Sequence, residues 1–167
     1  MTDRDEALRQ SEYIKRLRAL VSDREARLGR RLTACICTFG CQMNARDSEK
    51  LMGILREAGY EETDREDADL VLYNTCTVRE NANQRVYGRL GHVKTFREKN
   101  PDMLIGICGC MMQEEDEVLK IRQKYRYVDL VFGTHNIWKF PELLYSCITE
   151  KRRVIAIAEG HAADRLY

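Results

Sequence analysis

An α/β fold, built on a mostly parallel five-stranded sheet with helices on both faces, is the fold class that the sequence predicts. Short apolar runs alternate with longer amphipathic stretches from about residue 33 onward, which is the pattern of repeated strand–helix units. Helices of this length serve as crossovers, and they cover a parallel sheet on both sides. We therefore expect a three-layer sandwich of the flavodoxin-like or Rossmann-like type.

The five strands are expected at the apolar runs, at residues 33–38, 69–74, 103–108, 128–132 and 153–158. Helical periodicity follows the first four runs, at about residues 44–58, 78–99, 114–124 and 137–149. The third of these helices opens with acidic residues and closes with basic ones, which matches the helix dipole at both ends. Crossovers in parallel sheets are right-handed, so every strand-to-helix turn is expected at one edge of the sheet.

The first helix of the main domain has recognisable start and stop signals. Asn44 is expected to be its N-cap, with Asp47 at the capping-box position, and Gly59 is expected to end it. Asn74 and Thr134-His135-Asn136 are read in the same way, as turn or cap residues.

Residues 1–30 are rich in Arg and Glu and carry apolar residues near helical spacing. We expect a helical extension there, either as one amphipathic helix packed on the main domain or as a weakly ordered lead-in. Residues 31–160 are then the main domain, and residues 161–167 are a tail.

Composition limits the class of protein. Of the 167 residues, 44% are apolar and 33% are charged, and the net charge is only +1, which argues against tight binding of nucleic acid by this domain alone. No apolar run is long enough to span a membrane, and the N-terminus has no signal-peptide core, so a cytoplasmic protein is expected. Disulfides are rare in that compartment, so the seven cysteines are expected to be core residues, nucleophiles or metal ligands.

Three cysteines stand in equivalent turns, directly after three successive predicted strands: Cys41, Cys76 and Cys110. At the carboxyl edge of a parallel sheet these thiols converge on the usual ligand crevice. Three separated thiolates suit a [4Fe–4S] cluster that keeps one iron open. Structural zinc prefers four protein ligands, so the residues alone leave open a zinc site with His135 as fourth ligand.

The other cysteines are interpreted as packing residues: Cys35 and Cys37 in the first strand, Cys108 in the third and Cys147 in the last helix. Arg79 follows Cys76 closely and is a candidate to offset the negative charge of a thiolate-ligated cluster, or else lies on a solvated helix face. Amide donation to cluster sulfurs is the second interpretation of Asn44 and Asn74.

Three linked motifs resemble a known family: TFGCQMNARDSE at residues 38–49, NTCTVRENA at residues 74–82 and GCMMQ at residues 109–113. In order and spacing they are similar to the signatures of the radical-SAM methylthiotransferases, and the resemblance runs from about residue 33 to residue 160. It implies that Cys41, Cys76 and Cys110 bind an auxiliary [4Fe–4S] cluster. It also implies that the open iron carries the sulfur, or methylated sulfur, that is inserted into the substrate.

The residues after Cys41, Gln42-Met43-Asn44, are similar to one branch of that family. This branch inserts a methylthio group at C2 of isopentenyl-modified adenosine in tRNA. The alternatives are a methylthiotransferase of a ribosomal protein or of another tRNA adenosine, and, from a different class, a flavodoxin-like module with zinc or redox thiols and no catalytic role.

The chain departs from the family because it lacks a Cys-x-x-x-Cys-x-x-Cys motif. Cys37 and Cys41 have the first spacing, but Asn44 occupies the third position. We expect this chain to be the N-terminal domain of a longer enzyme and to be inactive alone. The second [4Fe–4S] cluster, the S-adenosylmethionine site and the RNA-binding domain are expected in the missing part, through which the enzyme meets tRNA. No membrane partner is expected.

Overall fold

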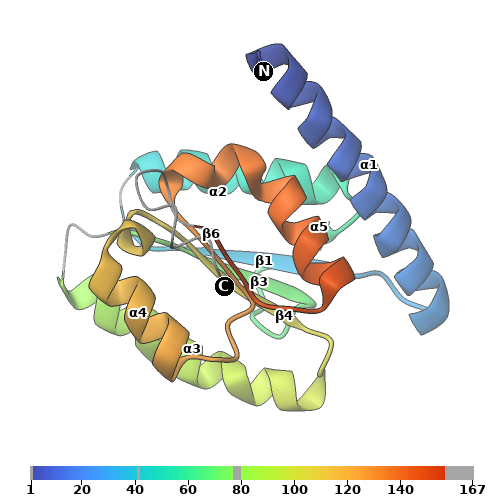
Figure 1. Cartoon of the computed structure of the whole chain (residues 1–167). Helices are drawn as coiled ribbons and strands as arrows, with labels where there is room; N and C mark the ends of the chain where they lie inside the picture. Colours follow the sequence, from blue (N-terminus) through green and yellow to red (C-terminus); the bar gives the residue numbers. More distant parts are fainter. Residues whose placement is uncertain (1, 41, 77–79, 157–167) are drawn as a thin grey trace.

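A parallel sheet is the centre of the fold (Figure 1). The computed structural model describes residues 2–40, 42–76 and 80–156. Within these residues six strands pair in the order β2-β1-β3-β4-β5-β6, and every pairing is parallel. In chain order they are β1 (Thr33–Thr38), β2 (Glu61–Glu62), β3 (Leu70–Thr75), β4 (Leu104–Gly109), β5 (Leu130–Phe132) and β6 (Val154–Ala156). The predicted α/β class with a mostly parallel sheet is confirmed.

The predicted number of five strands is wrong, because β2 adds a sixth at the edge of the sheet. This strand consists of two exposed glutamates, Glu61 and Glu62, which pair with Thr33 and Ala34 of β1. Two polar residues carry no apolar run and no alternation, so sequence periodicity cannot reveal such a strand.

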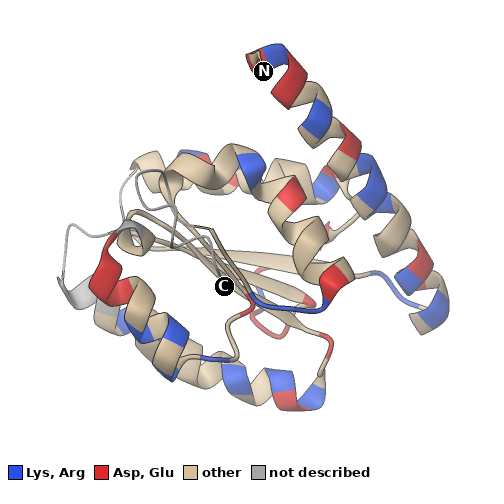
Figure 2. Cartoon of the chain, viewed as in Figure 1, with Lys and Arg blue, Asp and Glu red and all other residues tan. Residues whose placement is uncertain are grey.

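Helices cover both faces of the sheet and complete the three layers. On one face lie α1 (Asp3–Leu28), α2 (Gln42–Glu57) and α5 (Phe140–Glu150). On the other lie α3 (Glu80–Lys99) and α4 (Glu115–Lys124). Two 3₁₀ helices, η1 (Cys110–Gln113) and η2 (Thr134–Lys139), follow β4 and β5 directly. Charged side chains lie on the helices, the loops and β2, whereas the other strands carry none (Figure 2).

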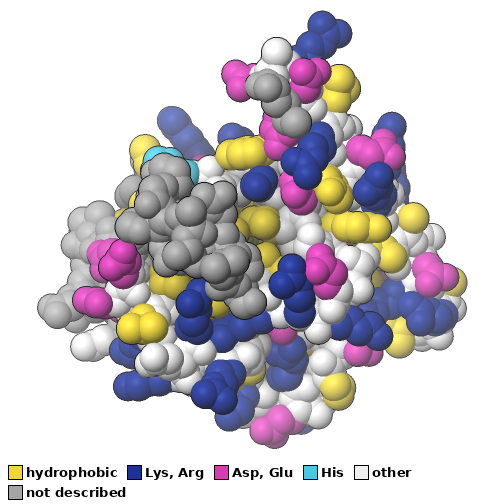
Figure 3. Space-filling view, in the orientation of Figure 1, with side chains coloured by type: hydrophobic (Ala, Val, Ile, Leu, Met, Phe, Trp, Pro, Cys, Tyr) yellow, Lys and Arg dark blue, Asp and Glu magenta, His cyan; other side chains and the backbone are white. Residues whose placement is uncertain are grey.

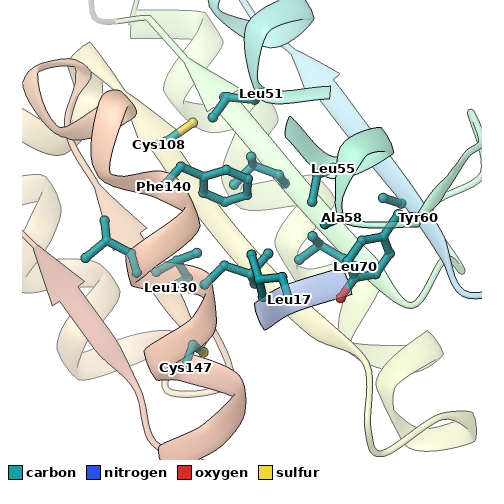
Figure 4. Close-up of a cluster of buried hydrophobic side chains, with 14 of the residues drawn as sticks. Leu17, Leu51, Leu55, Ala58, Tyr60, Leu70, Cys108, Leu130, Phe140 and Cys147 are labelled. Atoms are coloured by element: carbon teal, nitrogen blue, oxygen red, sulfur yellow. The ribbon is translucent and has the colours of Figure 1, made fainter. Parts of the chain in front are cut away.

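Each face of the sheet has its own hydrophobic core. Figure 4 shows the first, where Leu17 of α1, Leu51 of α2 and Phe140 of α5 meet the strand residues Leu70 and Leu130. The second lies under α3 and α4 and holds apolar residues of the central strands, among them Val71, Val86, Leu90, Ile105, Ile107 and Ile121. Burial on both faces explains why the central strands are continuous apolar runs in the sequence.

The N-terminal segment forms the helix α1, whose start is fixed by a capping box between Thr2 and Asp5. It ends at Gly29, which adopts a left-handed conformation. Leu17 and Val21 are buried against the layer of α2 and α5, so α1 is packed on the domain. Among the described residues, no helix has the length and apolar character needed to cross a membrane.

The expected N-cap role of Asn44 is wrong. Helix α2 already includes Gln42, so Asn44 lies within its first turn, and its side chain is 4% exposed. An asparagine at the start of a helical pattern resembles a cap in the sequence, but this one is directed into a buried polar network. The N-cap of η2 is likewise Gly133, which precedes the predicted cap residues Thr134-His135-Asn136.

Candidate functional site

Three adjacent strands end at the same level, and a candidate cysteine follows each of them. Thr38 of β1 pairs with Asn74 of β3, and Thr75 pairs with Gly109 of β4. Cys76 and Cys110 are the next residues after Thr75 and Gly109, so they leave neighbouring strands about 4.8 Å apart. The third candidate, Cys41, lies outside the described residues.

Gly40 brings the turn after β1 into direct contact with the turn after β3. A Cβ atom on Gly40 would lie 2.5 Å from the Cβ of Cys76 and 2.7 Å from Oδ1 of Asn44. Its φ of +130° is a second reason for glycine at this position. Gly40 is thus placed against Cys76, and Cys41 is the next residue in the chain.

Gly109 has the same function between β4 and β3. A Cβ atom there would lie 2.2 Å from the carbonyl oxygen of Thr75 and 2.9 Å from Oδ1 of Asn74, and its φ is +106°. Only the absence of a side chain lets these two strand ends approach so closely. Both close approaches occur one residue before a candidate cysteine.

A buried polar network ties the same strand ends together. Nδ2 of Asn44 donates to the carbonyl oxygen of Thr75 at 2.9 Å and to Oδ1 of Asn74 at 3.3 Å. Nδ2 of Asn74 donates in return to the carbonyl oxygen of Asn44 at 2.8 Å and to Oγ of Ser48 at 3.0 Å. The N–H of Phe39 donates to the carbonyl oxygen of Asn74, which adds the turn after β1.

This network assigns Asn44 and Asn74 a positioning role. Each side-chain amide has two N–H donors, and both asparagines use two donors on protein acceptors. The amides therefore hold the start of α2 against the end of β3, which leads to Cys76. Network members Ser48 and Thr75 lie in the first and second motifs, but sequence reasoning assigned them no role, because a short hydroxyl residue has no distinctive pattern of its own.

The two described cysteines at the carboxyl ends of the strands differ in exposure. Cys76 is 5% exposed, while Cys110 is half-buried, and its Sγ lies 3.4 Å from Oγ1 of Thr134. Met111 and Met112 follow Cys110 in η1 and are completely buried, so apolar side chains lie next to Cys110 on its inner side. The neighbouring His135, a candidate fourth ligand for zinc, is exposed to solvent.

The donor set at this edge fits a soft metal centre, because thiols at strand ends are the ligands that iron–sulfur clusters take. Within the described residues, which leave out Cys41, there is no group of three His, Cys, Asp or Glu side chains that could hold a metal ion. Cys41, the third candidate ligand, is therefore not part of that set.

Two arginines of α3 lie beside the turn that follows β1. The guanidinium carbon of Arg85 lies 5.5 Å from the ring centroid of Phe39, and that of Arg89 lies 5.9 Å from it. Phe39 directly precedes Gly40, so both cations stand near the turn that leads to Cys41. Arg79, the predicted cation, lies outside the described residues. Arg89 was missed because its ion pair with Glu66 joins residues far apart in the sequence.

Of the four cysteines interpreted as packing residues, Cys35, Cys108 and Cys147 are buried in the two cores, which confirms the prediction. Burial raises the pKa of the Cys147 thiol to about 12 and that of Cys108 still further, so both remain protonated at neutral pH. Cys37 packs against the second core as predicted, but it is only half-buried and lies beside Arg89, which the sequence did not predict.

Comparison with known proteins gives a family. The family model described as Uncharacterized protein family UPF0004 matches residues 33–133, which is more than half of the chain. The tRNA-2-methylthio-N(6)-dimethylallyladenosine synthase of Lachnoclostridium phytofermentans is 62% identical over 130 residues, which are 78% of this chain and 28% of that protein. The enzyme of the same name from Acetivibrio thermocellus is 47% identical over 165 residues, which are 97% of this chain and 34% of that protein.

The chain spans about a third of the length of the curated relatives that it matches. The matched region contains all three cysteine motifs and strands β1 to β5. By its sequence and its fold, the chain belongs to the UPF0004 family, the N-terminal domain of the methylthiotransferases.

Proposed function

We propose that this chain is the cluster-binding N-terminal domain of a tRNA methylthiotransferase. The observation that carries the proposal is the pair of close approaches at the carboxyl ends of the strands. Gly40 lies against Cys76, and Gly109 lies against Thr75, so the backbone that carries all three candidate cysteines is drawn together. A glycine that serves only to end a strand does not need neighbours so close that an added Cβ would lie 2.5 Å or less from them.

Cys41, Cys76 and Cys110 would hold an auxiliary [4Fe–4S] cluster with one iron open. When bound, this cluster would supply the sulfur that is inserted into the substrate. Asn44 and Asn74 fix the start of α2 against the end of β3 through their paired hydrogen bonds. The buried Met111 and Met112 keep water away from the inner side of the edge.

The domain limits that accompany this proposal are residues 31–160 for the cluster-binding domain, residues 1–30 for a helical extension and residues 161–167 for a tail. In the whole enzyme, a radical-SAM domain with a second [4Fe–4S] cluster and S-adenosylmethionine, and a domain that contacts RNA, would follow in cis. This chain alone would then be inactive. The localisation that accompanies this proposal is the cytoplasm, where thiols stay reduced.

The proposed substrate is isopentenyl-modified adenosine in tRNA, with insertion of the methylthio group at C2. It is supported by the names of the relatives, which are synthases of 2-methylthio-N(6)-dimethylallyladenosine in tRNA. The face shown in Figure 3 mixes Lys and Arg with Asp and Glu. This mixture agrees with a net charge of +1 and with RNA binding that depends mainly on another domain.

Anaerobic reconstitution with iron and sulfide tests the cofactor. We expect about four iron atoms and four sulfides per chain, and an EPR signal after reduction. Cys76→Ser and Cys110→Ser should lose most of this iron, whereas Cys147→Ser, a buried cysteine of α5, should keep it. Circular dichroism checks that each variant is folded. A colourless protein with one zinc per chain, or iron binding that Cys76→Ser leaves unchanged, would overturn the assignment in favour of a zinc or redox thiol module.

A domain exchange tests the substrate. The matching segment of the Acetivibrio thermocellus enzyme is replaced with this chain, and tRNA from a strain lacking its own synthase is analysed by mass spectrometry. We expect the methylthio mark on isopentenyl-modified adenosine. A folded, iron-loaded chimera that leaves tRNA unmarked would contradict the tRNA assignment, and a mark on a ribosomal protein would support the alternative branch.

A further inference from the structure

Two thiols of β1 form a pair outside the proposed cluster site. Cys35 and Cys37 are two residues apart in one strand, so they lie on the same face of the sheet. Their Sγ atoms are 3.9 Å apart. Cys35 is 3% exposed, and Cys37 is half-buried. The pair therefore has one inner thiol and one outer thiol.

The outer thiol has a charged neighbour. Nη2 of Arg89, on α3, lies 3.7 Å from Sγ of Cys37 and can donate a hydrogen bond to it. Arg89 is itself held by Glu66, whose two carboxylate oxygens lie 3.1 Å and 3.0 Å from its Nε. The hydroxyl of Tyr73 donates to the same carboxylate at 2.7 Å. The guanidinium is thus held beside Cys37 by Glu66, which Tyr73 holds in turn.

This environment makes the two thiols unequal. The hydrogen bond from Cys35 and the charge of Arg89 lower the pKa of Cys37, although burial and the Glu66 carboxylate oppose them. The hydrogen bond to Cys37 and burial raise the pKa of Cys35. The position of Arg89 beside Cys37 assigns the same order from geometry alone: Cys37 ionises more readily, and Cys35 is its protonated partner.

We propose that Cys35 and Cys37 form a redox-active dithiol that reacts with peroxides. The Cys37 thiolate attacks one oxygen of hydrogen peroxide, the O–O bond breaks, and Cys37 becomes a sulfenic acid while the other oxygen leaves as hydroxide. The sulfur of Cys35 then attacks the sulfenic sulfur and an S–S bond forms. The S–O bond breaks, and the hydroxyl group leaves as water with the proton of Cys35. The pair loses two electrons, and the peroxide gains them.

The strand geometry makes this reaction reversible. Residues i and i+2 of a strand have Cα atoms about 6.6 Å apart, near the upper end of the range that a disulfide spans. The two sulfurs must also approach from 3.9 Å to bonding distance. A disulfide formed under such strain is more readily reduced than a structural one, which is typical of a labile redox couple.

Peroxide titration of the reduced, iron-free chain tests the proposal. After quenching with an alkylating reagent, tryptic peptide 32–46, which contains Cys35, Cys37 and Cys41, is analysed by fragmentation mass spectrometry. We expect loss of two hydrogens between Cys35 and Cys37 before Cys147 is oxidised. In Cys35→Ser, we expect a sulfenic acid at Cys37 that dimedone traps.

Substitution of Arg89 tests the origin of the reactivity. Arg89→Met should slow oxidation of Cys37 about tenfold, as expected for a thiol pKa that rises by about one unit, and Arg89→Lys should restore most of the rate. Cys147→Ser is the matched control and should leave the rate unchanged. Oxidation that reaches Cys147 first, or a disulfide that joins Cys37 to Cys41, would overturn the proposal.

The outcome is independent of the proposed cluster. Cys76→Ser, which should abolish iron binding, is expected to leave the reaction of Cys35 and Cys37 with peroxide intact. A chain that binds no iron but forms the disulfide would therefore refute only the proposed function, and a chain with a cluster but an inert pair would refute only the dithiol.

Discussion

Replacing Gly109 with alanine is expected to destabilise the carboxyl end of the sheet strongly. Gly109 has φ of +106° and ψ of −173°, a region that only glycine populates readily, so the backbone strain costs about 1–3 kcal/mol. The new Cβ would also lie 2.2 Å from the carbonyl oxygen of Thr75, and relieving this overlap by backbone movement costs about 1–3 kcal/mol. We expect a total loss of about 2–6 kcal/mol in the free energy of unfolding.

Urea unfolding, followed by circular dichroism, measures this loss as a lower midpoint at a similar slope. Gly91→Ala is the matched control, because Gly91 lies in α3 and a Cβ there meets nothing within 4 Å. It should stabilise the chain by about 0.5–1 kcal/mol through helix propensity. If Gly109→Ala unfolds within 0.5 kcal/mol of the original chain, the strand ends are not held as closely as we describe.

Three further changes probe other parts of the structure. Asn74→Ala removes three side-chain hydrogen bonds, two of them buried, and should cost about 2–4 kcal/mol in urea unfolding; a loss below 1 kcal/mol would show that the network is dispensable. Arg153→Met removes the donors to four carbonyl groups around the end of α4 and should cost about 2–4 kcal/mol, measured in the same way, and an unchanged midpoint would contradict this. Burial opposes ionisation of Asp69, but hydrogen bonds from Arg30 and Thr33 outweigh burial and lower the pKa of Asp69. The ionised carboxylate therefore stabilises the fold at pH values above 3.8, the ordinary pKa, and this stabilisation is lost as the pH falls below that value. The stability difference between the original chain and Asp69→Asn should therefore shrink as the pH is lowered from about 5 to about 3, and a gap that stays constant would refute this role.

Strong local patterns made the class of fold predictable. The runs around Val71, Ile105 and Val131 are apolar because the sheet is covered on both faces, so each run is visible without tertiary information. The same logic predicted that cysteines after successive strands share an edge, and the register of β3 with β4 places Cys76 and Cys110 there. The extra strand β2 was not predictable, since its pairing depends only on the backbone of Glu61 and Glu62.

Interactions between distant residues were the part that the sequence could not reveal. Asn44 looked like a helix cap, yet it bonds to Asn74, thirty positions later, across the end of the sheet. Gly40 and Gly109 looked like ordinary turn residues, and only their distances to Cys76 and Thr75 show that a side chain would not fit. Such contacts follow from how the turns meet in space, which periodicity and spacing do not encode.

The central claim is that Cys41, Cys76 and Cys110 together hold one [4Fe–4S] cluster. Its most direct test is the iron and sulfide content of two triple variants, reconstituted side by side under anaerobic conditions. One replaces these three cysteines with serine, and the other replaces the three buried cysteines Cys35, Cys108 and Cys147 with alanine. We predict less than one iron per chain in the first and about four in the second. Equal iron content in the two variants would contradict the account.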